Sequence, residues 1–221
     1  MADDDVTRAK SELRARLRAE RRSRYGGTDG ARRRLAEGRE LLTHAGPLLE
    51  LVTARITQSG RCRVAAFHPT PTEADVMPLA AALVSLGAEV VFPAEAGAEL
   101  EWIAWDGQAS FVPSAGKGFG KEPPGPRLGT DALAGASLVL APALAVDRGG
   151  ARIGHGAGYY DRALLHLPPD SPVVAVIHPA ELLPAGTVPR ERHDLPVGAV
   201  LTAHGLHRVE GQAAPASHEG P

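Results

Sequence analysis

The chain has 221 residues, a length that suits one domain or two small ones. Apolar residues make up 43% and charged residues 23%, and the formal net charge is −2, so the composition indicates an ordinary globular protein. The single cysteine, Cys62, excludes an internal disulfide framework and a structural zinc site built on several thiolates.

The sequence predicts a cytoplasmic protein with no membrane partner. Its longest apolar stretch, residues 138–146, is about half as long as a membrane-spanning helix. The N-terminus opens with Asp3, Asp4 and Asp5 and has no apolar core, so it does not resemble a secretory signal.

Positive charge gathers near the N-terminus, where residues 8–39 hold 12 of the 24 Lys and Arg residues. A solvated helix face is the ordinary interpretation of such a run. An anion site and a nucleic-acid surface are the sharper ones, and composition cannot choose among the three.

In chain order, the first predicted element is an amphipathic helix over residues 6–24, with Val6, Ala9, Leu13 and Leu17 on one face. Two glycines should end it at residues 26–27. Thr28 is predicted to cap a second helix, which Pro47 should kink or break.

Short apolar runs then alternate with helical patterns. Strands are predicted at residues 62–67, 89–92, 102–105, 137–141, 173–177 and 199–202, helices at 76–86 and 159–167, and a long loop at 110–130. This order predicts an α/β fold: a mainly parallel sheet with helices on both faces, Rossmann-like and three-layered, preceded by an N-terminal helical pair. Ligands are expected beyond the carboxyl ends of the strands. We expect a single domain over residues 1–209 and a disordered tail over 210–221.

The segment "LVLAPALAVDRGGARIGHGAGYYDR" (residues 138–162) carries the chemistry. A buried strand leads into a loop with Gly154, Gly156 and Gly158 at alternate positions, and a helix begins near Tyr159. Glycine amides and a helix N-terminus form an anion-binding concavity, to which Arg152 adds a cation. The spacing fits neither a Walker loop nor a dinucleotide fingerprint. We predict a triphosphate cradle, although a plain connecting turn is the usual explanation of a glycine-rich loop.

Asp161, in the first turn of that helix, would repel a neighbouring phosphate unless a cation lay between them. Magnesium, held by one or two carboxylates and phosphate oxygens, resolves this conflict. The alternative is that Asp161 only complements the helix dipole.

This segment closely resembles the signature of the 5-formyltetrahydrofolate cyclo-ligases, in which "PGLAFD" precedes "RLGxGxGYYDR". Here "PALAVD" is followed by "RIGHGAGYYDR". Four further segments resemble the family in the expected order: "KSELR", "FHPTPTEADV", "GFGKEP" and "HDLPVGAVLT". The resemblance spans about residues 10 to 202.

The resemblance implies an ATP- and magnesium-dependent ligase that converts 5-formyltetrahydrofolate into 5,10-methenyltetrahydrofolate, with ADP and phosphate released. Implied ATP-binding residues are Lys10, Arg14, Arg152, Ile153, Gly154, His155, Gly156, Ala157, Gly158, Tyr159 and Tyr160. Arg152 and Tyr160 are the implied catalytic residues. The reduced folate would contact His68, Glu73, His155, Gly156 and Tyr159, and Asp161 and Asp194 would bind Mg²⁺. We expect a monomer with these small-molecule substrates and no nucleic-acid partner.

Four positions depart from the family pattern. Val146 stands where an aromatic residue is common, Ala157 replaces Gly or Lys, and Lys121 replaces an apolar residue. Gly198 replaces a second acid, so metal binding at that end must rest on Asp194.

Two rival functions stay open at this stage. Another ATP-dependent transferase could share a similar glycine loop, although the Glu73 loop and the His-Asp pair at residues 193–194 argue against it. A nucleic-acid-binding module could use the basic helices, but aromatic residues, which stack on bases, are only 4% of the chain. ATP turnover with and without the reduced folate separates these functions.

Overall fold

The computed structural model describes residues 3–114, 120–191 and 194–209. Helical elements, in chain order, are α1 (Asp3–Tyr25), α2 (Gly27–His44), α3 (Gly46–Ser59), α4 (Met77–Ser85), the 3₁₀ helix η1 (Thr130–Gly135), α5 (Tyr159–Ala163), η2 (Leu164–His166) and η3 (Pro179–Glu181). Within these residues no helix is both long and apolar enough to cross a membrane.

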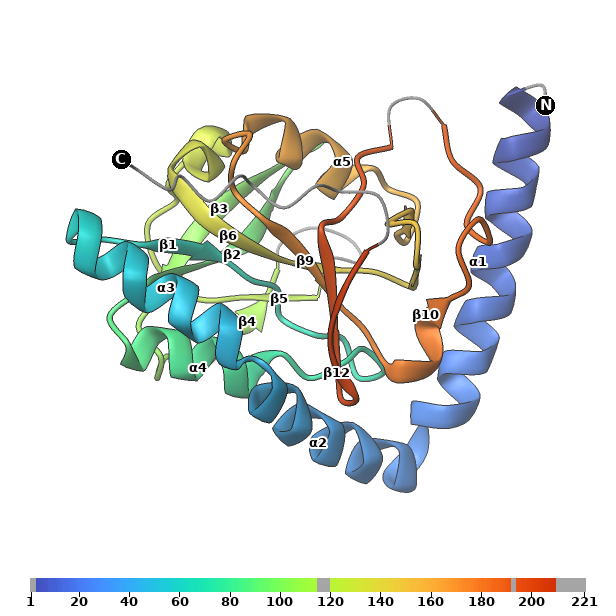
Figure 1. Cartoon of the computed structure of the whole chain (residues 1–221), viewed down its shortest axis with the longest axis horizontal. Helices are drawn as coiled ribbons and strands as arrows, with labels where there is room; N and C mark the ends of the chain where they lie inside the picture. The colour runs from blue at the N-terminus through green and yellow to red at the C-terminus, as the bar shows by residue number, and fades with distance from the viewer. Residues whose placement is uncertain (1–2, 115–119, 192–193, 210–221) are drawn as a thin grey trace, which may run out of the picture.

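A seven-stranded sheet forms the centre of the molecule (Figure 1). Its strand order is β12 (Gly205–Arg208), β11 (Ala199–Thr202), β9 (Val173–Val176), β6 (Ala136–Pro142), β1 (Arg63–Ala65), β2 (Glu89–Ala96) and β3 (Glu99–Trp105). The five inner strands pair in parallel, whereas both edge strands are antiparallel, since each follows its neighbour through a tight turn. The prediction of a mainly parallel sheet is confirmed.

Both faces of this sheet are covered, as the alternation along β6 illustrates. Leu138 and Leu140 pack into a cluster with α2, α3 and α4, whereas Val139 and Ala141 pack into a second cluster with η1, α5 and η2. Successive side chains of a strand point to opposite faces, so one apolar strand serves two cores. The three-layer α/β architecture is therefore confirmed.

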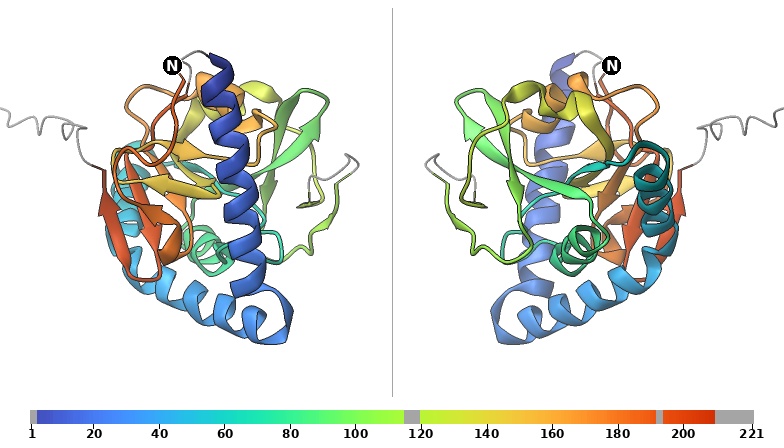
Figure 2. Two further views of the ribbon diagram at one scale, coloured as in Figure 1. Left: turned by 90° about the vertical axis from the view of Figure 1, so that its right-hand side faces the viewer. Right: turned by 90° about the vertical axis from the view of Figure 1, so that its left-hand side faces the viewer.

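Helix α1 stands beside the sheet and packs on a smaller one. That sheet has the order β10 (Leu182–Leu183), β7 (Ala145–Asp147) and β8 (Arg152–Ile153). Leu13 and Leu17 of α1 cluster with Leu144, Ile153 and Val188. The left view of Figure 2 shows α1 running along the height of the molecule. The predicted apolar stripe of α1 thus packs on this small sheet. This packing places the polar residues of α1 against the segment that contains the glycines at 154, 156 and 158.

Three local predictions change. Gly26 rather than Thr28 is the N-cap of α2, and no side chain caps it. The predicted second helix is two helices, α2 and α3, which separate at Ala45 with Pro47 in the first turn of α3. The predicted loop at 110–130 contains a short antiparallel pair, β4 (Val112–Pro113) and β5 (Lys121–Glu122), and ends in η1. The predicted tail, 210–221, lies outside the described residues.

Candidate active site

One cavity of about 430 Å³ gathers the predicted site residues. It lies beyond the carboxyl ends of β1 and β6, where Phe67 and Pro142 form part of its wall, as expected for a parallel sheet. Its lining includes every residue to which the sequence assigned a role: Lys10, Arg14, His68, Glu73, Arg152, Ile153, Gly154, His155, Gly156, Ala157, Gly158, Tyr159, Tyr160, Asp161 and Asp194. Glu191 and Lys121, which the sequence did not assign, also line it.

The glycine loop connects β8 to α5 along one side of the cavity. Gly156 and Gly158 have φ values of +101° and +70°, in the left-handed region that favours glycine. Helix α1 holds the loop from outside: Arg14 Nε donates to the Gly154 carbonyl oxygen at 3.1 Å, and Arg18 Nη2 donates to the His155 carbonyl oxygen at 2.6 Å. The loop conformation is therefore fixed by its own glycines and by two arginines more than 130 residues earlier in the chain.

Lys10 is buried in α1, between two carboxylates from the far end of the chain. Its Nζ lies 2.5 Å from Glu191 Oε2 and 2.6 Å from Asp194 Oδ2. The Glu191 backbone N–H also donates to Asp194 Oδ2 at 2.7 Å, which closes a small acidic turn around the ammonium group. Glu191 is the main functional candidate that the sequence missed. No local pattern in the sequence pointed to it, because its contact with Lys10 joins residues 181 positions apart.

Arg152 and Asp161 form an ion pair inside the cavity. The side chain of Arg152 is only 4% exposed, whereas that of Asp161 is 37% exposed. Each predicted metal ligand, Asp161 and Asp194, therefore faces a cation of the same cavity. Among the described residues no three His, Cys, Asp or Glu side chains form a preassembled metal cluster.

This arrangement still fits magnesium, because Mg²⁺ in phosphate sites uses one or two carboxylates together with phosphate oxygens and water. Asp161 and Asp194 would hold the metal, and Arg152 and Lys10 would then bind phosphate oxygens in place of these carboxylates.

Glu73 lies at another part of the cavity and is buried. Its Oε2 accepts the Thr70 backbone N–H at 2.8 Å, and its Oε1 lies 3.0 Å from His155 Nε2. Burial raises the pKa of Glu73, but the bonds from His155 and Thr70, with the electrostatic attraction of His155 and Arg21, outweigh burial and lower the pKa. Glu73 is thus an ionised acceptor inside an otherwise sheltered site.

His68 and Tyr160 are neutral polar groups on the cavity wall. Burial, followed by the nearby charge of Lys121, lowers the pKa of His68, which also packs on Phe111. Burial and then the charge of Glu73 raise the pKa of Tyr160, so its hydroxyl keeps its proton. Within the described part of the chain, that buried hydroxyl and Arg152 Nε have no hydrogen-bond partner. Both are donors that a ligand in the cavity can satisfy.

Tyr159 turns from the glycine loop toward the turn between β2 and β3. Its hydroxyl lies 3.2 Å from Glu95 Oε1 and 3.1 Å from the Gly97 carbonyl oxygen. Arg162, in the same helix, donates to the Ala98 carbonyl oxygen. This contact connects α5 to the edge of the main sheet and fixes the wall of the cavity.

The family model described as the 5-formyltetrahydrofolate cyclo-ligase family matches residues 6–203. The chain belongs to this family. A relative from Mycolicibacterium smegmatis (strain ATCC 700084 / mc(2)155) named 5-formyltetrahydrofolate cyclo-ligase is 39% identical over 148 residues, which are 65% of this chain and 74% of the relative.

Solved structures support the fold of this cyclo-ligase family member. The NMR structure of 5,10-methenyltetrahydrofolate synthetase from Aquifex aeolicus has a TM-score of 0.63 at 24% identity, over 95% of this chain and 97% of the other. A 5,10-methenyltetrahydrofolate synthetase from Mycoplasma pneumoniae has a TM-score of 0.59 at 15% identity, over 88% and 98% of the two chains. At these identities the two structures show that the fold is shared.

Proposed function

We propose that this chain is a 5-formyltetrahydrofolate cyclo-ligase, which uses ATP to form 5,10-methenyltetrahydrofolate, ADP and phosphate. One observation carries the proposal. The residues to which the resemblance assigns roles, separated by up to 184 positions, all line a single cavity together with cationic and carboxylate groups.

In the proposed reaction, the 5-formyl oxygen attacks the γ-phosphorus of ATP, and the bond from that phosphorus to ADP breaks. The N10 lone pair of the folate then attacks the activated formyl carbon. N10 loses its proton, and the former formyl oxygen leaves with the phosphate. Phosphorylation is required because an amide-like oxygen is a poor leaving group.

The protein contributes position and charge to this reaction. Lys10, Arg14 and Arg152 would neutralise the triphosphate, and the glycine loop would present its amides to the same oxygens. Asp161 and Asp194 would hold Mg²⁺, which when bound neutralises phosphate charge. Glu73 would accept hydrogen bonds from N–H groups of the reduced folate. His68 and His155 would line the folate part of the cavity.

The contact between His155 and Glu73 has a consequence for binding. A folate N–H group that uses Glu73 Oε1 must share this oxygen with His155 or displace it. The imidazole is 47% exposed and sits on the glycine loop, so it can move while the buried Glu73 stays in place. Folate binding would in this way shift a side chain of the glycine loop, which is proposed to bind the nucleotide.

We further propose that the chain works as a cytoplasmic monomer, with no nucleic-acid or membrane partner. Support comes from the substrates, because ATP and a reduced folate are both small molecules of the cell interior. Light scattering of the purified protein, with and without ATP, reports the oligomeric state directly.

The reaction is tested by incubating purified protein with ATP, Mg²⁺ and 5-formyltetrahydrofolate and measuring the absorbance of the methenyl product. We expect product only when all three are present, in proportion to the ADP released. ADP release that does not depend on the folate would instead indicate another ATP-dependent transferase or hydrolase. Absence of methenyl product with an active preparation would overturn the proposal.

A further inference from the structure

Besides His155, a positively charged residue lies close to the Glu73 carboxylate, and this residue is outside the cavity lining. Arg21 of α1 is absent from the cavity lining, and its side chain is only 3% exposed. Its Nη1 lies 3.9 Å from Glu73 Oε1. In the described part of the chain this buried nitrogen has no hydrogen-bond partner. Arg21 therefore places a positive charge and an unused donor behind the carboxylate that faces the cavity.

The rest of the guanidinium group is fixed. Arg21 Nε and Nη2 donate to the two carboxylate oxygens of Glu181 at 2.6 Å and 2.7 Å, and Nη2 also donates to the Ala143 carbonyl oxygen at 2.6 Å. Such a two-pronged pair holds the guanidinium plane in one orientation. The remaining nitrogen, Nη1, is consequently aimed at Glu73 without being able to rotate away.

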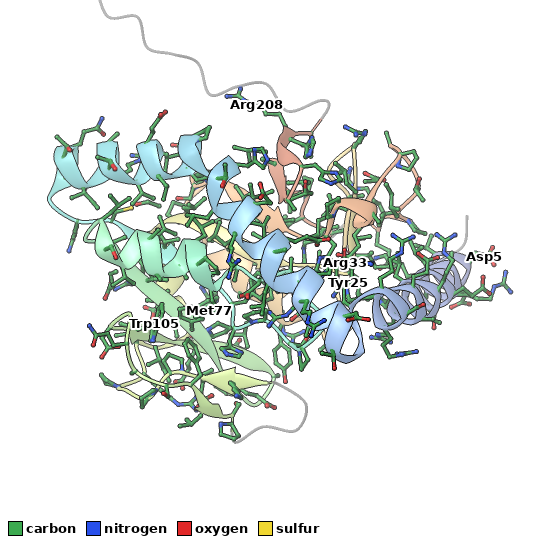
Figure 3. All side chains as sticks on the ribbon, turned by 90° about the horizontal axis from the view of Figure 1, so that it is seen from below. Asp5, Tyr25, Arg33, Met77, Trp105 and Arg208 are labelled. Atoms are coloured by element: carbon green, nitrogen blue, oxygen red, sulfur yellow. The ribbon has the colours of Figure 1, made fainter. Side chains whose placement is uncertain are left out.

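The backbone next to Glu73 is held by a different residue. His178 Nε2 lies 3.2 Å from the Thr72 carbonyl oxygen, and its Nδ1 lies 2.6 Å from Glu37 Oε2. Tyr25, labelled in Figure 3 at the corner between α1 and α2, stacks on the His178 ring with centroids 3.5 Å apart. The turn that carries Glu73 thus has an anchor of its own, and Arg21 acts on the carboxylate.

We infer that Arg21, oriented by Glu181, is a positioning residue that keeps the Glu73 carboxylate charged and correctly placed for the reduced folate. This inference rests on the proposed function in one respect, the identity of the ligand. Arg21 is absent from the cavity lining, so it would touch neither substrate. It acts through Glu73 because a buried carboxylate needs nearby positive charge and donors to stay ionised.

The test replaces the pair together, because removal of Arg21 alone would leave Glu181 as an unpaired buried charge. In Arg21→Met/Glu181→Gln, the new amide oxygen can still accept the His178 backbone N–H that Glu181 accepts in the parent. The matched control is Arg63→Met/Glu89→Gln. Arg63 likewise donates to a carboxylate, on Glu89, and to a carbonyl oxygen, on Ala132, away from the cavity.

We expect the KM for the reduced folate to rise about tenfold or more in Arg21→Met/Glu181→Gln, with the KM for ATP nearly unchanged. The control pair should change neither constant. Arg21→Lys, which keeps the cation, should restore part of the folate affinity and also provides a folded variant if the double variant fails to fold. Equal increases of both KM values would indicate a structural role and overturn the inference.

A second readout does not depend on turnover. Carbon-13 NMR follows the titration of glutamate carboxyls, and the Glu73 signal is identified by its loss in Glu73→Gln. The groups that act on Glu73 are His155, Arg21 and the Thr70 backbone N–H, while Glu73 in turn acts on Tyr160 and His68. The Glu73 titration should move to higher pH in Arg21→Met/Glu181→Gln and stay low in the control and in Arg21→Lys.

An unchanged Glu73 titration in Arg21→Met/Glu181→Gln would overturn the role of Arg21, whatever the kinetics. If instead the parent protein forms no methenyl product, the proposed function fails, and the titration still decides whether Arg21 controls Glu73. The two failures are therefore distinguishable.

Discussion

Lys10 lies in an arginine-rich helix, but the fold buries it and gives it two carboxylate partners. The side chain is only 7% exposed and contacts two carboxylates that are 22% and 15% exposed. Lys10→Ala leaves Glu191 and Asp194 without this cation, so we expect a loss of about 2 kcal/mol in the free energy of unfolding. We also expect a higher KM for ATP, because Lys10 is one of the charges proposed to bind phosphate. Urea unfolding and steady-state kinetics measure the two effects.

The control for this experiment is Arg22→Ala, in the same helix. Arg22 is exposed, so its replacement should leave the KM for ATP unchanged and alter stability by no more than about 0.5 kcal/mol. If Lys10→Ala and Arg22→Ala behave alike in the kinetics, α1 is only a packing element and the nucleotide site consists of the glycine loop.

The metal hypothesis can be tested at Asp161. Asp161→Asn keeps the size of the side chain but removes the charge that pairs with Arg152 and that would bind the metal. We expect the Mg²⁺ concentration for half-maximal activity to rise about tenfold, because a charged ligand to the ion is replaced by a weaker neutral one. Asp170→Asn, at an exposed position outside the cavity lining, is the matched control. A parental magnesium dependence in Asp161→Asn would remove Asp161 from the metal site.

At the scale of elements, the connection from β8 to α5 depends on glycine at Gly158, the N-cap of α5. Its φ is +70°, and a Cβ atom there would lie 2.6 Å from Arg162 Nη1. We expect Gly158→Ala to lower the free energy of unfolding by about 1–2 kcal/mol, which thermal or urea unfolding measures. The KM for ATP should rise as the loop shifts.

Gly46→Ala is the control for this substitution. Gly46 begins α3 with an ordinary φ, and a Cβ atom there would meet nothing within 4 Å. Alanine at this position should be neutral or slightly stabilising. Equal effects of the two substitutions would show that the left-handed conformation at Gly158 is unimportant.

Elements were predicted best where local chemistry specifies them. The stripe of Val6, Leu13 and Leu17 predicts α1, and Pro47 predicts the break before α3. The antiparallel direction of β3 was not predictable from its short apolar run, because direction depends on the turn and on the neighbouring strand. Thr28 was a wrong cap because α2 begins at Gly27, two residues earlier than a Thr28 cap would place it, with extended Gly26 as its cap.

The lining of the cavity could be predicted from the signature and its companion segments, but the contacts within it could not. Arg21 looked like one more charge in a basic helix, although its carboxylate partner is 160 residues away. Glu191 was likewise hidden, since nothing local shows that it meets Lys10. Pairs formed by the tertiary fold leave no spacing in the sequence from which they could be read.

At the scale of the whole molecule, Glu73 connects stability to pH. Its pKa in the folded protein lies below the ordinary value of 4.5. As the pH falls toward 4.5, Glu73 therefore takes up a proton more readily in the unfolded chain than in the folded protein. The stabilisation from the ionised carboxylate is therefore complete above this value and is lost as the pH falls through the folded pKa. We expect Glu73→Gln to be less stable than the parent at neutral pH and to converge with it in acid.

Urea unfolding at a series of pH values measures this difference. Glu50→Gln, at an exposed position of α3, is the control and should follow the parent curve throughout. Parallel curves for Glu73→Gln and the parent would contradict the lowered pKa of Glu73.

The contact of Lys10 with Asp194 spans 184 positions of the chain. During synthesis on the ribosome, the first helix emerges long before its carboxylate partners, which lie more than 180 positions later in the chain. The central strands can begin to fold before then, since domains acquire structure as they are synthesised. Until both partners emerge, the ammonium group of Lys10 lacks the pair of carboxylates that holds it in the folded protein. A nascent chain that stops short of residue 191 should therefore bind ATP weakly, even where the strands β1, β2 and β6 have formed.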